Sequence, residues 1–182
     1  MKTRTVILWI AILIIIDQLI KVIITTCFGE SQFEIIPSLL EFHPTYNEKH
    51  SYVNSLLNKH FGINVGLLPH LVLYFVLGIL ISIHLFYFRN KIQSNAKLLD
   101  ISIIFMVAAA SCTLVGNLVW EKGILDYIYL KPLFVFDLKD TYADISIVFF
   151  VLYAFKNRKE LKSIKSKDAF LFAKEKLKNN NK

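Results

Sequence analysis

Cysteine is scarce in this chain of 182 residues, which contains only Cys27 and Cys112. Two cysteines so far apart provide neither a disulfide framework nor the spacing of metal ligands. The sequence also lacks an HExxH motif, a glycine-rich phosphate loop, and a Ser-His-Asp order that fits the topology expected below. Serine and metal mechanisms are therefore unsupported, and we predict no metal and no cofactor.

Charge is absent from two long stretches, residues 61–88 and residues 101–120. The chain is 55% hydrophobic, with a mean hydropathy of +0.50, far above that of an ordinary soluble domain. Because a membrane-spanning helix needs about 20 apolar residues, we expect an all-α integral membrane protein with four transmembrane helices. The predicted spans are residues 5–26, 68–88, 100–119 and 140–157. The last apolar run is short, so its helix must start near Lys139.

Basic residues gather on one side of these spans. Fifteen of the 21 Lys and Arg residues precede the first span, connect the second to the third, or follow the fourth. The positive-inside rule then places both termini in the cytoplasm and the loops 27–67 and 120–139 outside. We expect a transmembrane domain over 1–160 and a basic cytoplasmic tail over 161–182. The net charge of +7 predicts contact with anionic lipid headgroups and no nucleic-acid binding.

The first outer loop is polar and irregular. Alternation of apolar and polar residues around Phe33 to Ile35 predicts short strands, and residues 52–58 predict a short amphipathic helix on the membrane surface. Apolar side chains in this surface helix would touch lipid.

Two polar features lie within the first and third spans. Asp17 and Lys21 are four residues apart on one helix face, where they can form an ion pair. Either these charges reach the outer headgroups, or they face the bundle and organise the mouth of a site. Asn117, at the outer end of the third span, would hydrogen-bond between helices or orient a carboxylate.

Two carboxylates, Asp126 and Asp144, flank the linker between the last two spans. Two carboxyl groups within hydrogen-bond reach share a proton, so that one activates water while the other polarises a scissile carbonyl. An alternative remains for each residue. Asp144 fits a helix start with Thr141 as N-cap, and Asp126 could be an ordinary loop acid. Asp137 and Asp140 are alternative members of such a pair.

The order of several short motifs resembles the lipoprotein signal peptidases, also called signal peptidase II, over roughly residues 8–156. These motifs are Asp17-Gln18-x-x-Lys21, Asn47 followed by Tyr52, Gly116-Asn117-Leu118, Leu125-Asp126-Tyr127, and Ala143-Asp144. The resemblance implies a multi-pass enzyme of the bacterial cell membrane. Such an enzyme is an intramembrane aspartic endopeptidase that cuts prolipoproteins before their diacylglyceryl-modified cysteine.

Residue by residue, the resemblance assigns the catalytic pair to Asp126 and Asp144. It assigns supporting or substrate-binding roles to Asp17, Lys21, Asn47, Asn117 and Thr141. It also implies that the first outer loop forms a small extracytoplasmic β-cradle and surface helix that clamp the signal peptide. Membrane lipids are the other expected partner, and we expect a monomer.

The chain departs from the family pattern at several positions. Trp120 and Glu121 stand where the family usually has an Asp-Arg pair, and Lys49 replaces a glycine. Thr141 replaces an asparagine, and Asp140 stands where an aromatic residue is expected. We interpret the chain as a divergent active peptidase. The alternatives are a non-catalytic relative that binds lipoprotein precursors or assists another membrane enzyme, and a small transporter, which the lack of an internal repeat disfavours.

Overall fold

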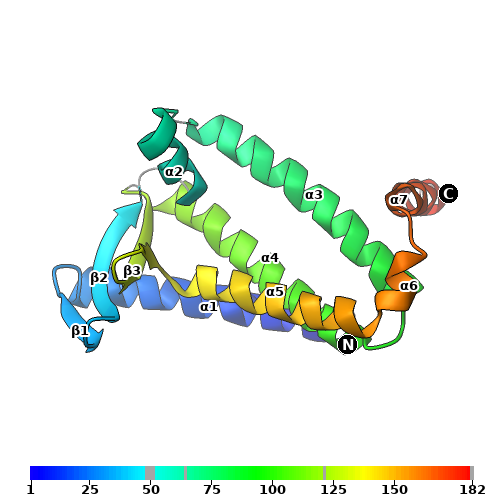
Figure 1. The fold of residues 1–182 in the computed structure, drawn as a ribbon, viewed down its shortest axis with the longest axis horizontal. Coiled ribbons are helices and arrows are strands. Elements are labelled where there is room, and N and C mark those ends of the chain that lie inside the picture. The colour runs from blue at the N-terminus through cyan, green and yellow to red at the C-terminus, as the bar shows by residue number, and fades with distance from the viewer. Residues whose placement is uncertain (48–51, 64, 121, 181–182) are drawn as a thin grey trace.

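The computed structural model describes residues 1–47, 52–63, 65–120 and 122–180, which form helices and one small sheet (Figure 1). The helices are α1 (Thr3–Cys27), α2 (Tyr52–Phe61), α3 (Leu67–Lys91), α4 (Ala96–Val119), α5 (Leu138–Lys156), α6 (Arg158–Lys162) and α7 (Ser166–Asn180). The strands are β1 (Phe33–Ile36), β2 (Leu40–Asn47), β3 (Ile124–Leu130) and β4 (Phe134–Phe136).

Three helices in the described part of the chain are long and apolar enough to cross a membrane. They are α1, the part of α3 from Leu71 to Lys91, and α4. The prediction of a mostly helical membrane protein with a small sheet is therefore confirmed for these three helices. The fourth predicted span, α5, has 19 residues, and its first two turns carry Lys139, Asp140 and Asp144, which shorten its apolar length.

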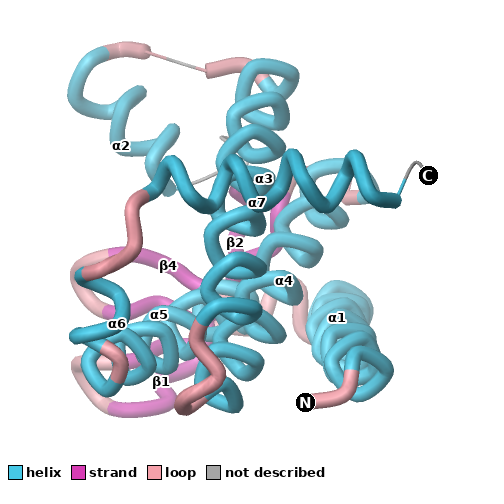
Figure 2. The backbone as a smooth tube through the Cα atoms, turned by 90° about the vertical axis from the view of Figure 1, so that its right-hand side faces the viewer, coloured by secondary structure: helices cyan, strands magenta, loops and turns pink. Residues whose placement is uncertain are grey.

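Helix α4 is the centre of the bundle, where it packs against α1, α5 and α3. Figure 2 shows α4 and α5 adjacent to each other, with α1 beside α4. Small buried residues on α4, Ala108 and Ala109, let the neighbouring helices approach closely. Further along the same interface, the Ser102 and Ser146 hydroxyls each donate to the other residue's carbonyl, at 3.0 and 2.9 Å. These reciprocal bonds fix the position of α5 along α4.

Helix α3 diverges from helices α1, α4 and α5 (Figure 1). It approaches α4 at the end nearest the chain termini, where Arg89 forms an ion pair with the buried Asp100. Leu85 and Ile92 are buried there with Leu99 of α4. Away from this contact, most side chains of α3 are exposed, so α3 is held mainly at one end.

The sheet lies at the opposite end of the molecule from the two termini (Figure 1). Its strands run in the order β1-β2-β3-β4, and each neighbouring pair is antiparallel. The β3–β4 hairpin connects α4 to α5, so the sheet stands directly above the start of α5. Ile24 at the end of α1 packs with Phe42 and Leu125, which fixes the sheet on the bundle.

Helix α5 begins four residues earlier than the Thr141 cap predicts. Asp137 is the N-cap: its carboxylate accepts from the Asp140 backbone N–H, while the Asp140 carboxylate accepts from the Asp137 backbone N–H. This reciprocal capping box satisfies two backbone donors. Thr141 is already within the first turn, where its hydroxyl donates to the Asp137 carbonyl. The prediction of Thr141 as N-cap is therefore wrong, because Asp137 directly follows β4 in an extended conformation.

Candidate functional site

A buried network of charged side chains joins α1, β3 and the start of α5. The Lys21 Nζ lies 3.0 Å from the Asp17 carboxylate and 2.7 Å from that of Asp137. The Lys139 Nζ lies 2.9 Å from the other oxygen of Asp137 and 2.8 Å from Asp126. Asp137 therefore bridges two ammonium groups. All five residues are buried, so solvent screens these interactions very little.

Asp140 forms the half-exposed edge of this network. Its carboxylate lies 3.3 Å from the Lys139 Nζ. Oxygens of Asp126, Asp137 and Asp140 all lie within 4.8 Å of one another. The Lys139 ammonium group contacts all three carboxylates, so a protein cation already occupies the position that a bound metal ion would take.

The network contains more negative than positive groups, because four aspartates share two lysines. Burial raises the pKa of Asp126 above its ordinary value, with Asp137 adding to the rise and Lys139 opposing it. Burial would also raise the pKa of Asp137, but Lys139 and Lys21 together bring it below its ordinary value. The surroundings thus shift the pKa values of these two carboxyl groups in opposite directions. Asp126 holds a proton more readily than Asp137.

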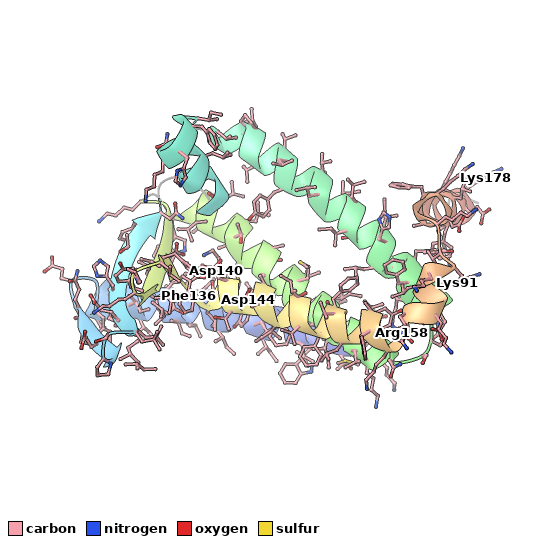
Figure 3. All side chains as sticks on the ribbon, in the orientation of Figure 1. Lys91, Phe136, Asp140, Asp144, Arg158 and Lys178 are labelled. Atoms are coloured by element: carbon pink, nitrogen blue, oxygen red, sulfur yellow. The ribbon has the colours of Figure 1, made fainter. Side chains whose placement is uncertain are left out.

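Asp144 lies one helical turn beyond Asp140 on α5. Figure 3 shows both residues near the end of α5 that meets the sheet. Residues four apart on a helix have Cβ atoms about 5–6 Å apart, so Asp144 is the neighbour of Asp140 on one face of α5. The Asp144 side chain is exposed, and it makes no hydrogen bond or ion pair within the described part of the chain. In the described part of the chain, Asp126 contacts Lys139 and no hydrogen bond joins it to Asp144, so the pairing of the two acids stays a prediction.

The predicted supporting residues divide between the network and its surroundings. Asp17 and Lys21 belong to the network, and the i, i+4 ion pair predicted for them is confirmed. Asn47 ends β2 opposite Ile124, at the end of β3 nearest Asp126. The Asn117 amide donates to the Thr113 carbonyl one turn earlier in α4, at 3.0 Å.

Lys139 is a central residue of the site that sequence reasoning missed, since we considered it only as the start of a span. Its neighbours Asp137 and Asp140 were alternatives to the predicted pair. One sequence signal was available: Asp137 is followed three residues later by a second acid, Asp140, shortly before an apolar run, which is the spacing of a capping box. That signal locates the start of α5, and hence the position of Lys139 in its first turn.

Trp120 occupies the position where the family pattern usually has an acid. Its indole N–H donates to the Gln18 side-chain oxygen at 3.1 Å, and the Gln18 amide donates to Asp17 at 2.8 Å. Trp120 therefore connects the end of α4 to the charged network through α1. Two of the other departures noted above, Glu121 and Lys49, lie outside the described residues.

The fold and the site define a helical membrane protein with a buried acidic network beneath a small sheet. The family model of signal peptidase (SPase) II matches residues 9–156, and the chain belongs to that family. The predicted resemblance is confirmed. Signal peptidase II is an aspartic peptidase family of the bacterial cytoplasmic membrane that acts on prolipoprotein signal peptides. Membership therefore supports a membrane protease that processes lipoproteins.

Two solved structures share this fold. One is described as a bacterial membrane enzyme structure obtained by the in meso method at 1.9 Å resolution. It is 24% identical to this chain, with a TM-score of 0.64, and the match covers 85% of this chain and 95% of that one. The second carries the same description at 2.3 Å, with 23% identity, a TM-score of 0.63, and coverage of 90% and 94%. The comparison with curated proteins gave no match.

Proposed function

We propose that this chain cleaves prolipoproteins on the N-terminal side of their diacylglyceryl-modified cysteine, with Asp126 and Asp144 as its two catalytic acids. The observation that supports this most is the contrast between them. Asp126 is buried, with a raised pKa, while Asp144 is exposed directly before the apolar part of α5. An unpaired carboxylate at the edge of hydrocarbon is costly, which makes it a functional candidate.

The proposed orientation places the site at the outer membrane surface. Lys91, Arg158 and Lys178 lie at the end of the molecule opposite Asp140 and Asp144 (Figure 3). The positive-inside rule assigns that basic end, with both termini, to the cytoplasm. Helix α5 has 19 residues and is therefore about 28 Å long, close to the thickness of a bilayer core. On this proposal α5 is the fourth span, and Asp144 lies just inside the outer boundary.

The proposed reaction divides the chemistry between the two acids. Protonated Asp126 donates a hydrogen bond to the scissile carbonyl oxygen and polarises it. Ionised Asp144 takes a proton from a water molecule, whose oxygen attacks the carbonyl carbon. The carbon–nitrogen bond then breaks, and the departing cysteine nitrogen receives the proton that Asp144 took from the water, which restores both acids to their starting states. In this proposal the peptide bond and the attacking water bind between the two acids.

In this proposal the lysines position the acids. Lys139 fixes the Asp126 carboxyl against the start of α5, and Lys21 fixes Asp137, the cap of the same helix. Catalytic groups must be held close to their productive geometry by the residues around them. Asp17, Asn47, Asn117 and Thr141 are proposed to complete this frame.

The test is cleavage of a diacylglyceryl-modified prolipoprotein by membranes from cells that lack their own signal peptidase II. We expect Asp126→Asn and Asp144→Asn each to slow cleavage by about 100- to 10,000-fold, the usual contribution of a positioned acid or base. Glu30→Gln is the matched control, because it makes the same chemical change on an exposed residue preceding β1. Protein abundance and thermal unfolding are measured for every variant.

Each other outcome has a distinct meaning. If Asp144→Asn cleaves normally and Asp140→Asn does not, the second acid is Asp140 and the proposed pair is wrong. If well-folded wild-type protein cleaves no lipobox substrate, the chain is a non-catalytic relative that binds precursors.

A further inference from the structure

The C-terminal helix α7 packs crosswise against the C-terminal end of α3, as Figures 1 and 2 both show. We call this the inner end of α3, because it lies on the side of the chain termini. Aromatic rings make this contact. The Phe170 ring meets His84 edge to face, with centroids 5.5 Å apart, and the Phe172 ring lies 5.5 Å from that of Tyr87. Ala169 is fully buried. These contacts fix which side of α7 faces α3.

The contact also fixes the depth of α7. His84 precedes the last residue of α3, Lys91, by seven positions, which corresponds to about 10 Å along the helix. The headgroup region on each side of a bilayer is roughly 5–8 Å thick. In the proposed orientation, helix α7 therefore crosses the last two turns of α3 between the edge of the hydrocarbon core and the headgroups.

The exposed side of α7 carries a row of lysines around one apolar residue. Lys167, Leu171, Lys174 and Lys178 are spaced at i, i+4, i+7 and i+11, so they share one helix face, and all four are exposed. We name these four residues the lysine stripe. The acidic residues of α7, Asp168 and Glu175, are seven positions apart and fall on a separate stripe.

We propose that the lysine stripe binds anionic phospholipid headgroups of the leaflet on the side of the chain termini, with Leu171 inserted among the lipids. A helix that lies in the interface combines apolar side chains with lysines in this way. Each lysine near an anionic surface raises the binding constant for that surface roughly five-fold, so three lysines raise it roughly 100-fold. Because Phe170 and Phe172 hold α3, lipid binding by α7 also fixes the inner end of α3. This surface is independent of the proposed peptidase chemistry.

The test uses the full chain in nanodiscs and requires no enzyme activity. A Cys27→Ser, Leu171→Cys chain carries an environment-sensitive fluorophore at position 171, while Cys112 stays buried. We expect blue-shifted emission when phosphatidylglycerol is added to phosphatidylcholine, and reversal of that shift by salt, which screens surface charge. Changing all three stripe lysines to Gln should abolish the shift.

The matched control removes three exposed lysines at the same end of the molecule but outside α7: Lys97→Gln, Lys159→Gln and Lys162→Gln. This control should keep the full shift. The proposal is overturned if emission is the same in both lipids. It is also overturned if the stripe variant keeps the shift, or if both triple variants lose it equally, since net charge alone would then explain the result.

Discussion

Replacement of Lys139 by methionine removes the cation shared by three carboxylates while keeping the length and much of the volume of the side chain. Lys139 lies 2.8 Å from Asp126, 2.9 Å from Asp137 and 3.3 Å from Asp140. Removal of one partner from a buried ion pair costs about 3–5 kcal/mol, because the remaining charge is left in a poorly solvated site. For a chain of this size we expect a fall in the unfolding midpoint of roughly 10 °C.

Thermal unfolding in detergent can be followed with a thiol-reactive dye in a Cys27→Ser background, since Cys112 becomes accessible only when α4 separates from its neighbours. Adding Asp137→Asn to Lys139→Met should restore part of the midpoint, because it removes one of the uncompensated charges. Lys131→Met is the control: it removes the same charge from ion pairs with Glu34 and Glu41 at the sheet surface, where solvent screens it, and should lower the midpoint far less. An unchanged midpoint in Lys139→Met, or no recovery in the double variant, would refute the proposed role of this lysine.

Three further predictions concern other parts of the structure. A Cβ at Gly116 would lie 3.1 Å from the Ile124 side chain, so Gly116→Val should destabilise the chain by about 1–3 kcal/mol. In thermal unfolding, adding Ile124→Ala to Gly116→Val should recover part of that loss. Ser146→Ala removes a buried hydrogen bond from α5 to α4 and should cost about 0.6 kcal/mol in denaturant titrations; a larger loss than for Gly116→Val would contradict this. Hydrogen bonds from Lys131 hold the pKa of Glu34 and Glu41 below the ordinary value, so their stabilisation is present near neutral pH and is lost as pH falls through those lowered values. The difference in unfolding midpoint between wild type and Lys131→Met should accordingly disappear in acid. A difference that grows in acid would show that Lys131 does not lower the pKa of Glu34 and Glu41.

Local patterns in the sequence predict the parts of this structure that depend on neighbouring residues. Long apolar runs identify α1, α3 and α4, and the four-residue spacing of Asp17 and Lys21 predicts their ion pair. The alternation around Phe33 locates β1. Each of these features depends on helix or strand periodicity, which is visible in one short stretch of sequence.

The charged network could not be predicted in this way, because its contacts join residues distant in the sequence. Lys21 and Asp137 meet only when α1 lies beside the start of α5, and Lys139 meets Asp126 only when the β3–β4 hairpin folds back. The Thr141 cap failed for a related reason. Two overlapping capping patterns compete at the start of α5, and the end of β4 decides between them by leaving Asp137 extended.

The ion pair within α1 has a consequence for the assembly of the protein during its synthesis. The ribosome delivers α1 long before Asp137 exists, and an isolated charge would delay entry of that helix into the bilayer. Asp17 and Lys21 neutralise each other within one helical turn, at 3.0 Å, so α1 needs no later segment in order to insert. When α5 arrives, Asp137 adds a second carboxylate to a lysine that is already in place. The first and last long helices are thereby joined in the order in which translation produces them.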